Sequence, residues 1–282
     1  MVRIKSVLVL LLLIFLSQTA SAKVVCTTTV LAGIVEDLTG EEVEIIASPS
    51  VCPAHYDIKP SDVDKVRDAD IIFIHGMEPW VGELLNVSGS KAKVVKVPGP
   101  WNTPELLRQK YIAVAKALEE EGYSVSLKPS LDKINRTEKY LKEFAKKNGF
   151  VGTPVVCMQW QKNFVEFLGF NITVTYPPPE MVSAKKYEEI IEKGRGSKLV
   201  IDNLQSGTEL GKKIAKDIGA KEVALSNFPA DGNLTEMMIE NAEKLAKALE
   251  SERVESERQT PGFELVTGIA AAAVAALATR RD

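Results

Sequence analysis

The chain is poor in the side chains that dominate catalytic and metal sites, with only two histidines and three cysteines among 282 residues. It contains no Gly-X-Ser-X-Gly turn, no His-Glu-X-X-His helix and no phosphate-binding loop, which are the signatures of common hydrolases and nucleotide-binding enzymes. Positive charge is not in excess, since the formal net charge is −3, and no basic stripe with interleaved aromatic residues is present. These absences argue against an enzyme and against a nucleic-acid partner.

The N-terminus has the pattern of a secretion signal. Arg3 and Lys5 precede an apolar run from Val7 to Leu16, and Ala20-Ser21-Ala22 offers the small residues that a signal peptidase requires. The run is short for a bilayer whose hydrocarbon core is about 30 Å thick. Cleavage after Ala22 is therefore favoured over an N-terminal anchor helix.

The C-terminus predicts attachment to a membrane. An apolar run follows Thr260-Pro261-Gly262-Phe263-Glu264 and ends before Arg280 and Arg281. It is only just long enough to span a bilayer, and the arginines would stay on the cytoplasmic side. The pattern resembles the Pro-Gly-Phe sorting signals of archaeal surface proteins, whose tail is replaced by a lipid anchor; the alternative is a plain transmembrane helix. Both place the domain at the cell surface, on the outer face of the cytoplasmic membrane.

An external location also fits the four Asn-X-Ser/Thr tripeptides of the chain, which are acceptors for glycosylation and begin at Asn86, Asn135, Asn171 and Asn233. One such tripeptide is weak support. Four in a chain with an export signal predict a glycosylated surface.

Strand and helix patterns alternate between the two ends. The run from Ile71 to Ile74 is apolar on both faces, which suits a parallel sheet covered by helices on each side. A long helical region from Thr103 interrupts the alternation, which resumes at Pro154. We therefore expect an α/β fold of two lobes with mainly parallel sheets, joined by a long backbone helix. Ligands of such sheets bind beyond the carboxyl ends of the strands, so the ligand cleft is expected between the lobes.

The patterns give the following expected boundaries: a signal peptide at 1–22, an N-terminal α/β lobe at 23–102, a connecting helix at 103–125, a C-terminal α/β lobe at 126–250, a linker at 251–260, and a sorting signal or transmembrane segment at 261–282. We expect the protein to be a monomer.

Four segments carry a resemblance to a known family, and they are Cys52 to Asp62, Ala69 to Trp80, Leu199 to Gln205, and Met237 to Asn241. They resemble, in order and spacing, the zinc/manganese solute-binding proteins of ABC importers. The resemblance implies two α/β lobes joined by one rigid helix, a transition metal held in the cleft as cargo, and delivery to an ABC transporter permease. It also implies that His55 is a metal ligand, because the family has a histidine in the corresponding loop.

The chain departs from this family at three ligand positions. Pro98-Gly99-Pro100-Trp101 has no histidine where the family has a His-X-Trp turn. Cys157-Met158-Gln159-Trp160 stands where the third family histidine is found, and Ser226-Asn227 carries no carboxylate.

The few sulfur and imidazole groups all fall at strand ends or in cleft loops. Cys52 and His55 lie three residues apart in one loop, and thiolate and imidazole are the usual ligands of zinc. We predict a metal site with Cys52 and His55, completed by Cys157 or Cys26 and by Met158. In an exported protein two of the cysteines could instead form a disulfide, and Cys26 could be a small buried hydrophobe.

Three further residues are candidates for the walls of the cleft. His75 ends the third expected strand, where it is either a cleft residue or a histidine bonded within the fold. Trp101 and Trp160 follow strand ends, and aromatic walls suit an organic ligand or a cation over a ring face.

The sequence thus predicts a non-enzymatic solute-binding component that captures a transition metal, with Zn²⁺ favoured, and passes it to a permease. The alternative cargo is a metal chelate or a small organic cation. An extracellular metal hydrolase is less favoured, because no general base beside an open metal position is evident. A surface adhesin or sensor on the same fold stays open, because fold does not fix function.

Overall fold

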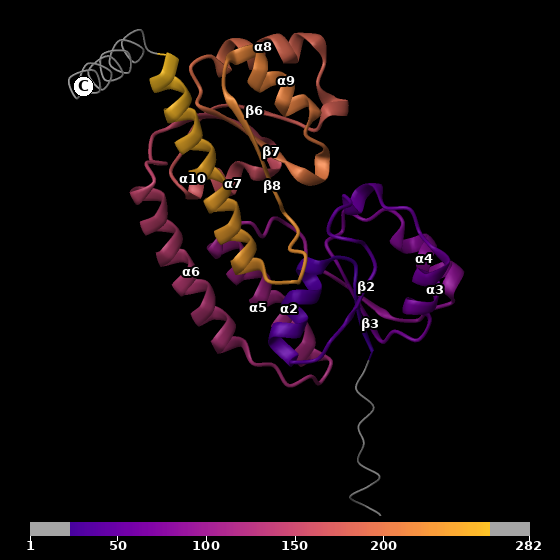
Figure 1. The fold of residues 1–282 in the computed structure, drawn as a ribbon. Helices are drawn as coiled ribbons and strands as arrows, with labels where there is room; N and C mark the ends of the chain where they lie inside the picture. The colour runs from indigo at the N-terminus through magenta and orange to yellow at the C-terminus, as the bar shows by residue number, and fades with distance from the viewer. Residues whose placement is uncertain (1–22, 260–282) are drawn as a thin grey trace, which may run out of the picture.

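Two four-stranded sheets organise residues 23–259, the part of the chain that the computed structural model describes (Figure 1). Every strand pair is parallel, which confirms the predicted α/β class with two lobes. The expected signal peptide and the expected sorting segment lie outside the described residues.

The first sheet has the strand order β2-β1-β3-β4. Its strands are β1 (Val24–Cys26), β2 (Glu44–Ile45), β3 (Ile71–Ile74) and β4 (Lys93–Lys96). The helices of this lobe are α2 (Thr29–Thr39), α3 (Pro60–Arg67) and α4 (Val81–Ser88), with a 3₁₀ turn η1 (Pro53–His55). Alternate strand residues face opposite ways, so Val25 and Ile72 pack with α3 and α4 while Cys26 and Phe73 pack with α2.

The second sheet has the order β6-β5-β7-β8 and the same construction. Its strands are β5 (Pro154–Met158), β6 (Asn171–Tyr176), β7 (Leu199–Asn203) and β8 (Lys221–Leu225). Its helices are α7 (Lys162–Phe167), α8 (Ala184–Gly194), α9 (Glu209–Ile218) and α10 (Leu234–Gln259), with 3₁₀ turns η2 (Gln159–Gln161), η3 (Pro179–Met181) and η4 (Leu204–Ser206).

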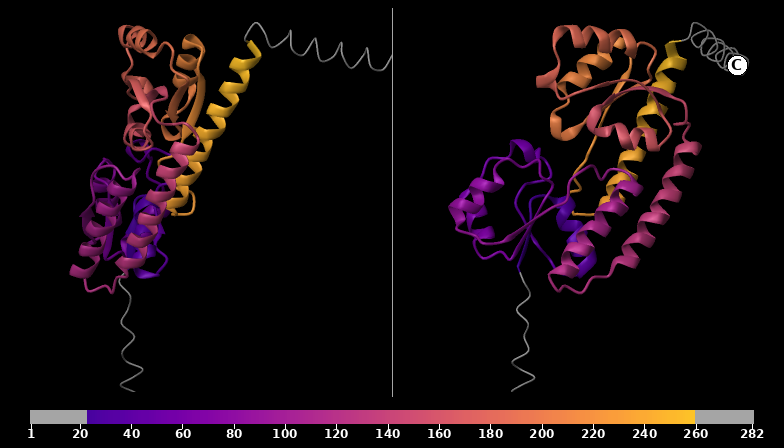
Figure 2. Two further views of the ribbon diagram at one scale, coloured as in Figure 1. Left: turned by 90° about the vertical axis from the view of Figure 1, so that its left-hand side faces the viewer. Right: turned by 180° about the vertical axis from the view of Figure 1, so that it is seen from behind.

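Two helices connect the sheets, α5 (Pro104–Glu120) and α6 (Leu127–Lys147). The expected connecting helix at 103–125 corresponds to α5, which Thr103 caps by accepting a hydrogen bond from the Leu106 amide. α5 packs against α2, and α6 packs against both α5 and α10. Figures 1 and 2 show that α6 covers the distance from the first lobe to the second, with α10 beside it. The predicted connection is therefore made by two antiparallel helices, of which the second spans the lobes.

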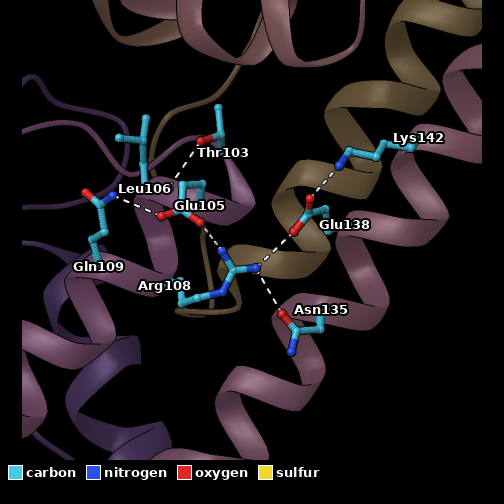
Figure 3. Close-up of polar contacts among 8 residues, drawn as sticks. All are labelled: Thr103, Glu105, Leu106, Arg108, Gln109, Asn135, Glu138 and Lys142. Atoms are coloured by element: carbon cyan, nitrogen blue, oxygen red, sulfur yellow. Dashed lines mark hydrogen bonds and ion pairs between the residues drawn. The ribbon is translucent and has the colours of Figure 1, made fainter.

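A polar network fastens α5 to α6 (Figure 3). The Arg108 guanidinium donates to Asn135 Oδ1 and Glu138 Oε2, both at 2.9 Å, and pairs with Glu105 on its own helix. Lys142 donates to the other oxygen of Glu138 at 2.6 Å. These bonds hold the pKa of Glu138 below its usual value, the contribution of Lys142 being the larger. Half-exposed pairs stabilise weakly one by one, so the network sets the alignment of the two helices more than the stability.

One hydrophobic core runs through both lobes. Residues of β1, β3, α2, α5 and α6 belong to the same buried cluster as residues of β5, β7 and α10. Because protein interiors are close-packed and deform little, this shared core holds the lobes as one body and fixes the space between their strand ends.

The last helix differs from its predicted extent. The sequence pattern predicts a helix ending near Leu249 and a linker at 251–260, but α10 continues to Gln259. Within residues 23–259, no helix combines the length and the apolar character needed to cross a membrane.

Candidate functional site

A cleft of about 540 Å³ lies between the carboxyl ends of the two sheets. Both lobes contribute to its lining, which consists of Cys52, Pro53, Ala54, Met77, Gly99, Pro100, Trp101, Asn102, Gln159, Trp160, Asn163, Asn203, Gln205, Ser206, Asn227 and Phe228. Most of these residues lie in the segments that follow the strands, while Asn203 ends β7 and Asn163 lies in α7; this is the position that parallel α/β sheets offer to ligands.

Trp80 anchors the loop that carries Cys52. The indole Nε1 of Trp80 donates to the carbonyl oxygen of Pro53 at 2.7 Å. The Tyr56 ring packs against the Trp80 ring at 5.2 Å, and the Tyr56 hydroxyl donates to Asp62 Oδ2 at 2.8 Å. Asp62 also accepts from the Lys59 amide at the start of α3. These contacts hold the family-like segment from Cys52 to Asp62 in place, and its first three residues, Cys52 to Ala54, form part of the cleft wall.

Trp101 joins the two lobes at the floor of the cleft. Its indole Nε1 donates to the carbonyl oxygen of Asn227 at 2.7 Å, and its ring contacts Phe228 at a centroid distance of 5.3 Å. The adjacent Asn102 donates from Nδ2 to the carbonyl oxygen of Trp160 at 2.9 Å. These bonds connect residues far apart in the sequence, and they set the width of the cleft.

A buried ionisable cluster lies behind Trp101. His75 Nε2 is 2.8 Å from Thr28 Oγ1, and burial lowers the pKa of His75 from 6.5 to about 4. Glu78 accepts from the Thr27 hydroxyl at 2.7 Å and from the His75 amide at 2.9 Å. Burial opposes the ionisation of Glu78, but these hydrogen bonds outweigh it and leave its pKa lowered.

Lys110 completes this cluster from α5. Its amine donates to the carbonyl oxygens of Val97 and Pro98, both at 2.5 Å, and lies 5.7 Å from the centre of the Trp101 ring. Burial lowers the pKa of Lys110 to about 8. The cluster supports the turn before Trp101, and the sequence analysis missed both Glu78 and Lys110.

The second lobe supplies a wall of amide groups. Gln161 donates to Asn203 Oδ1 at 3.1 Å, and Gln205 donates to the carbonyl oxygen of Pro49 in the first lobe at 3.1 Å. The backbone N–H of Asn227 donates to Gln205 Oε1 at 3.1 Å. Trp160 also lines the cleft, and 52% of its surface is exposed.

Of the predicted site residues, Cys52, Trp101 and Trp160 line the cleft. His75 is buried behind Trp101, bonded within the fold, as the alternative interpretation of this residue held. His55 is exposed at the end of η1 and is not among the lining residues. All three cysteines are free thiols, so none of them forms a disulfide.

Three of the residues predicted to complete the metal site, Cys26, Cys157 and Met158, are not among the lining residues of the cleft. All three side chains are fully buried. Cys26 and Cys157 face the shared core, while Met158 faces the opposite side of its sheet. A strand buried on both faces directs its alternate side chains into the two helical layers, so these three side chains do not line the cleft. The loop residues beyond them, such as Gln159 and Trp160, do.

The described residues, 23 to 259, hold no group of three or more His, Cys, Asp or Glu side chains that could bind a metal ion. The lining of the cleft contains one residue of these types, Cys52, and no charged residue. The polar groups of the cleft are mainly side-chain amides, which the sequence analysis did not single out. The signal was present in the sequence, since Asn102 follows Trp101 and Asn227 stands at a family ligand position.

Two parallel α/β lobes, a connection made by helices and a cleft between opposed strand ends define the class of two-lobed solute-binding proteins. The family model for the periplasmic component A of zinc-uptake complexes matches residues 24–248. The chain belongs to this family.

Individual relatives are distant. An uncharacterized protein of Rickettsia prowazekii (strain Madrid E) is 28% identical over 234 residues, which is 75% of this chain and 78% of the relative. The crystal structure of ZnuA aligns with a TM-score of 0.66 at 18% identity, covering 81% of this chain and 99% of that one. A periplasmic zinc-binding protein of Treponema pallidum aligns with a TM-score of 0.61 at 16% identity, covering 81% and 99%. These structural similarities support the fold.

Proposed function

We propose that the protein is the extracytoplasmic solute-binding component of an ABC importer, and that it captures a transition metal, with zinc favoured, for delivery to the permease. The observation that carries the proposal is the position of the cleft. Each of the three segments to which the family resemblance assigns further ligands contributes residues to its lining; these segments are Pro98 to Trp101, Cys157 to Trp160, and Ser226 to Asn227.

The relatives support a metal as cargo. The family is described as a zinc-uptake component. Among proteins of similar fold, one was solved with Zn(II) and another, from P. aeruginosa, with Ni²⁺. Solute-binding proteins do not transform their cargo, so the proposal includes no catalytic step.

Cys52 is our candidate for the protein ligand. Its thiol lies in the cleft wall and is partly exposed, whereas burial raises the pKa of the Cys26 and Cys157 thiols and keeps them protonated. A cysteine binds a metal as its thiolate, so the accessible Cys52 suits this role and the two buried cysteines do not.

The test is the metal content of the full chain, purified under reducing conditions without chelators from cells grown with added zinc. We expect about one zinc per chain, and a loss of most of it in Cys52→Ser. His55→Ala is the matched control, since it removes a potential ligand that lies outside the cleft. Folded protein that carries no transition metal from any such preparation would contradict a metal as cargo.

Attachment to the membrane, the monomeric state and glycosylation belong to the same proposal. The sorting segment at 261–282 would hold the domain beside its permease. Asn86 and Asn171 are exposed, whereas Asn233 accepts a hydrogen bond from the Glu236 amide at 3.3 Å, at the start of α10. Mass spectrometry of the native protein should therefore find glycans at Asn86 or Asn171 before Asn233.

A further inference from the structure

The cleft offers too few protein ligands for a bare ion. Zinc in proteins takes four ligands from cysteine, histidine or carboxylate side chains, and the lining supplies one residue of these types, Cys52. Its volume of about 540 Å³ falls in the range of pockets for small organic molecules, roughly 300 to 1,000 Å³. An ion held here must bring most of its ligands with it.

The charge of the cleft restricts what those ligands can be. No lining residue is Lys, Arg or His, so an anionic chelator would find no side chain to compensate its charge. Asn102 and Asn227 both direct Nδ2 toward the carbonyl oxygen of Trp160, at 2.9 and 3.4 Å. Their Oδ1 atoms are buried without a hydrogen-bond partner. Unpaired buried acceptors are costly, and a rotation of either side chain would turn its oxygen toward the N–H donors of a ligand.

The aromatic residues indicate the shape of the ligand and the sign of its charge. Trp160 is 52% exposed although it lines a cleft, and Trp101 and Phe228 lie on the same lining. Indole faces attract cations and planar rings. A flat, cationic ligand would cover Trp160 and exclude water from around it.

The geometry points to a cargo that is not the free ion but its complex with a small, neutral or cationic amine ligand. This inference rests on the proposed function and specifies its substrate class. The amine nitrogens occupy most of the coordination positions, and their N–H groups face the oxygens of Asn102 and Asn227. The Cys52 thiol releases its proton to solvent and replaces one metal-bound water, so that a single protein ligand is enough.

Histamine is a suitable probe, since it chelates through an imidazole and an amine and has no carboxylate. Four titrations of the reduced full chain, followed by calorimetry and by tryptophan fluorescence, compare zinc sulfate, histamine, zinc with histamine, and zinc with citrate. We expect the zinc–histamine mixture to bind at least about tenfold more tightly than zinc sulfate or histamine alone. Zinc citrate, an anionic complex, should not bind.

Variants connect the binding to the cleft. Trp160→Leu removes an exposed ring and leaves the fold intact, and we expect it to weaken zinc–histamine binding by about tenfold, the value of a cation–π contact of moderate strength. Trp160→Phe keeps a ring face and should retain most of the affinity. Asn102→Leu should weaken the complex as well.

The outcomes separate this inference from the proposed function. Tight binding of zinc sulfate alone, unchanged in Trp160→Leu, would overturn the inference and leave the metal-importer function standing. Equal binding of histamine with and without zinc would overturn both, because the metal would then contribute nothing. No binding in any titration would overturn the inference, while the metal content of the purified chain would still decide the proposed function.

Discussion

The imidazole of His75 stacks on the indole of Trp101, with ring centroids 4.3 Å apart and planes inclined by 24°. His75 follows β3 of the first sheet, and Trp101 hydrogen-bonds to Asn227 beyond the second sheet. The pair therefore couples a buried titratable group to the contact between the lobes. The floor of the cleft depends on a histidine that stays neutral.

The stability of the protein should fall in mild acid because of His75. Burial lowers its pKa from 6.5 to about 4, so between these values the unfolded chain binds a proton that the folded chain does not. The free energy of unfolding should decline as pH drops from about 6.5 to 4, by ~3 kcal/mol at ~1.4 kcal/mol per pH unit. Glu78, whose pKa is lowered, adds a further loss below its ordinary value of 4.5.

Urea unfolding at a series of pH values measures this effect. His75→Asn keeps a polar side chain at the strand end but does not titrate, so its stability should change much less between pH 6.5 and 4.5. A variant that loses stability with acid as steeply as the parent would show that another group is responsible.

The indole N–H of Trp101 should matter for the relative position of the lobes. Trp101→Phe keeps a ring against His75 but leaves the Asn227 carbonyl without its donor, at a cost of ~1 to 2 kcal/mol. Trp80→Phe is a matched control, because Trp80 also donates to a carbonyl at 2.7 Å, within one lobe.

Thermal unfolding should show similar losses in both tryptophan variants, and solution scattering should separate them. We expect only Trp101→Phe to increase the radius of gyration or to broaden the distance distribution of the molecule. Identical scattering of the two variants would mean that other contacts, such as Gln205 to Pro49 at 3.1 Å, fix the lobes.

The architecture could be predicted from the sequence because its signals are local. The apolar run from Ile71 to Ile74 became a strand buried at all but its last position, and Thr103-Pro104 began a helix as expected. The sequence could not show which of the two consecutive helices, α5 or α6, spans the lobes. That depends on the packing of α6 against α10, two helices that are far apart in the sequence.

The position of the cleft could be predicted from the sequence, but most of the side chains that line it could not. Placing ligands at strand ends correctly located the cleft, but Cys26 and Cys157 still belong to the strands and point into the core. A shift of one or two residues decides between core and cleft in a strand that is buried on both sides. The amides of Asn102 and Asn227 carry no strong motif, and only their convergence in three dimensions makes them part of a site.

The three cysteines should differ sharply in reactivity. Cys52 is partly exposed in the cleft wall, while Cys26 and Cys157 are fully buried. Burial raises the pKa of both core thiols, and thiolates are the reactive species. Ellman's reagent should modify one thiol per folded, reduced chain and three after denaturation. Cys52→Ser should abolish the fast reaction, whereas fast modification of two thiols in the folded state would contradict the burial of the strand cysteines.

The backbone of α2 at Gly33 approaches the loop before α10 so closely that there is no room for a side chain. A Cβ on Gly33 of α2 would lie 2.0 Å from the carbonyl oxygen of Gly232, in the loop before α10. That oxygen belongs to the backbone, so relief requires α2 and the loop to separate. Gly33→Ala should therefore destabilise the fold by ~3 kcal/mol through overpacking, despite the better helix propensity of alanine.

Gly82→Ala in α4 is the control, since a Cβ there meets no atom within 4 Å, and it should be neutral or stabilising by up to ~1 kcal/mol. Equal stability of the two variants in urea unfolding would show that the contact between α2 and the 232 loop is not maintained in solution.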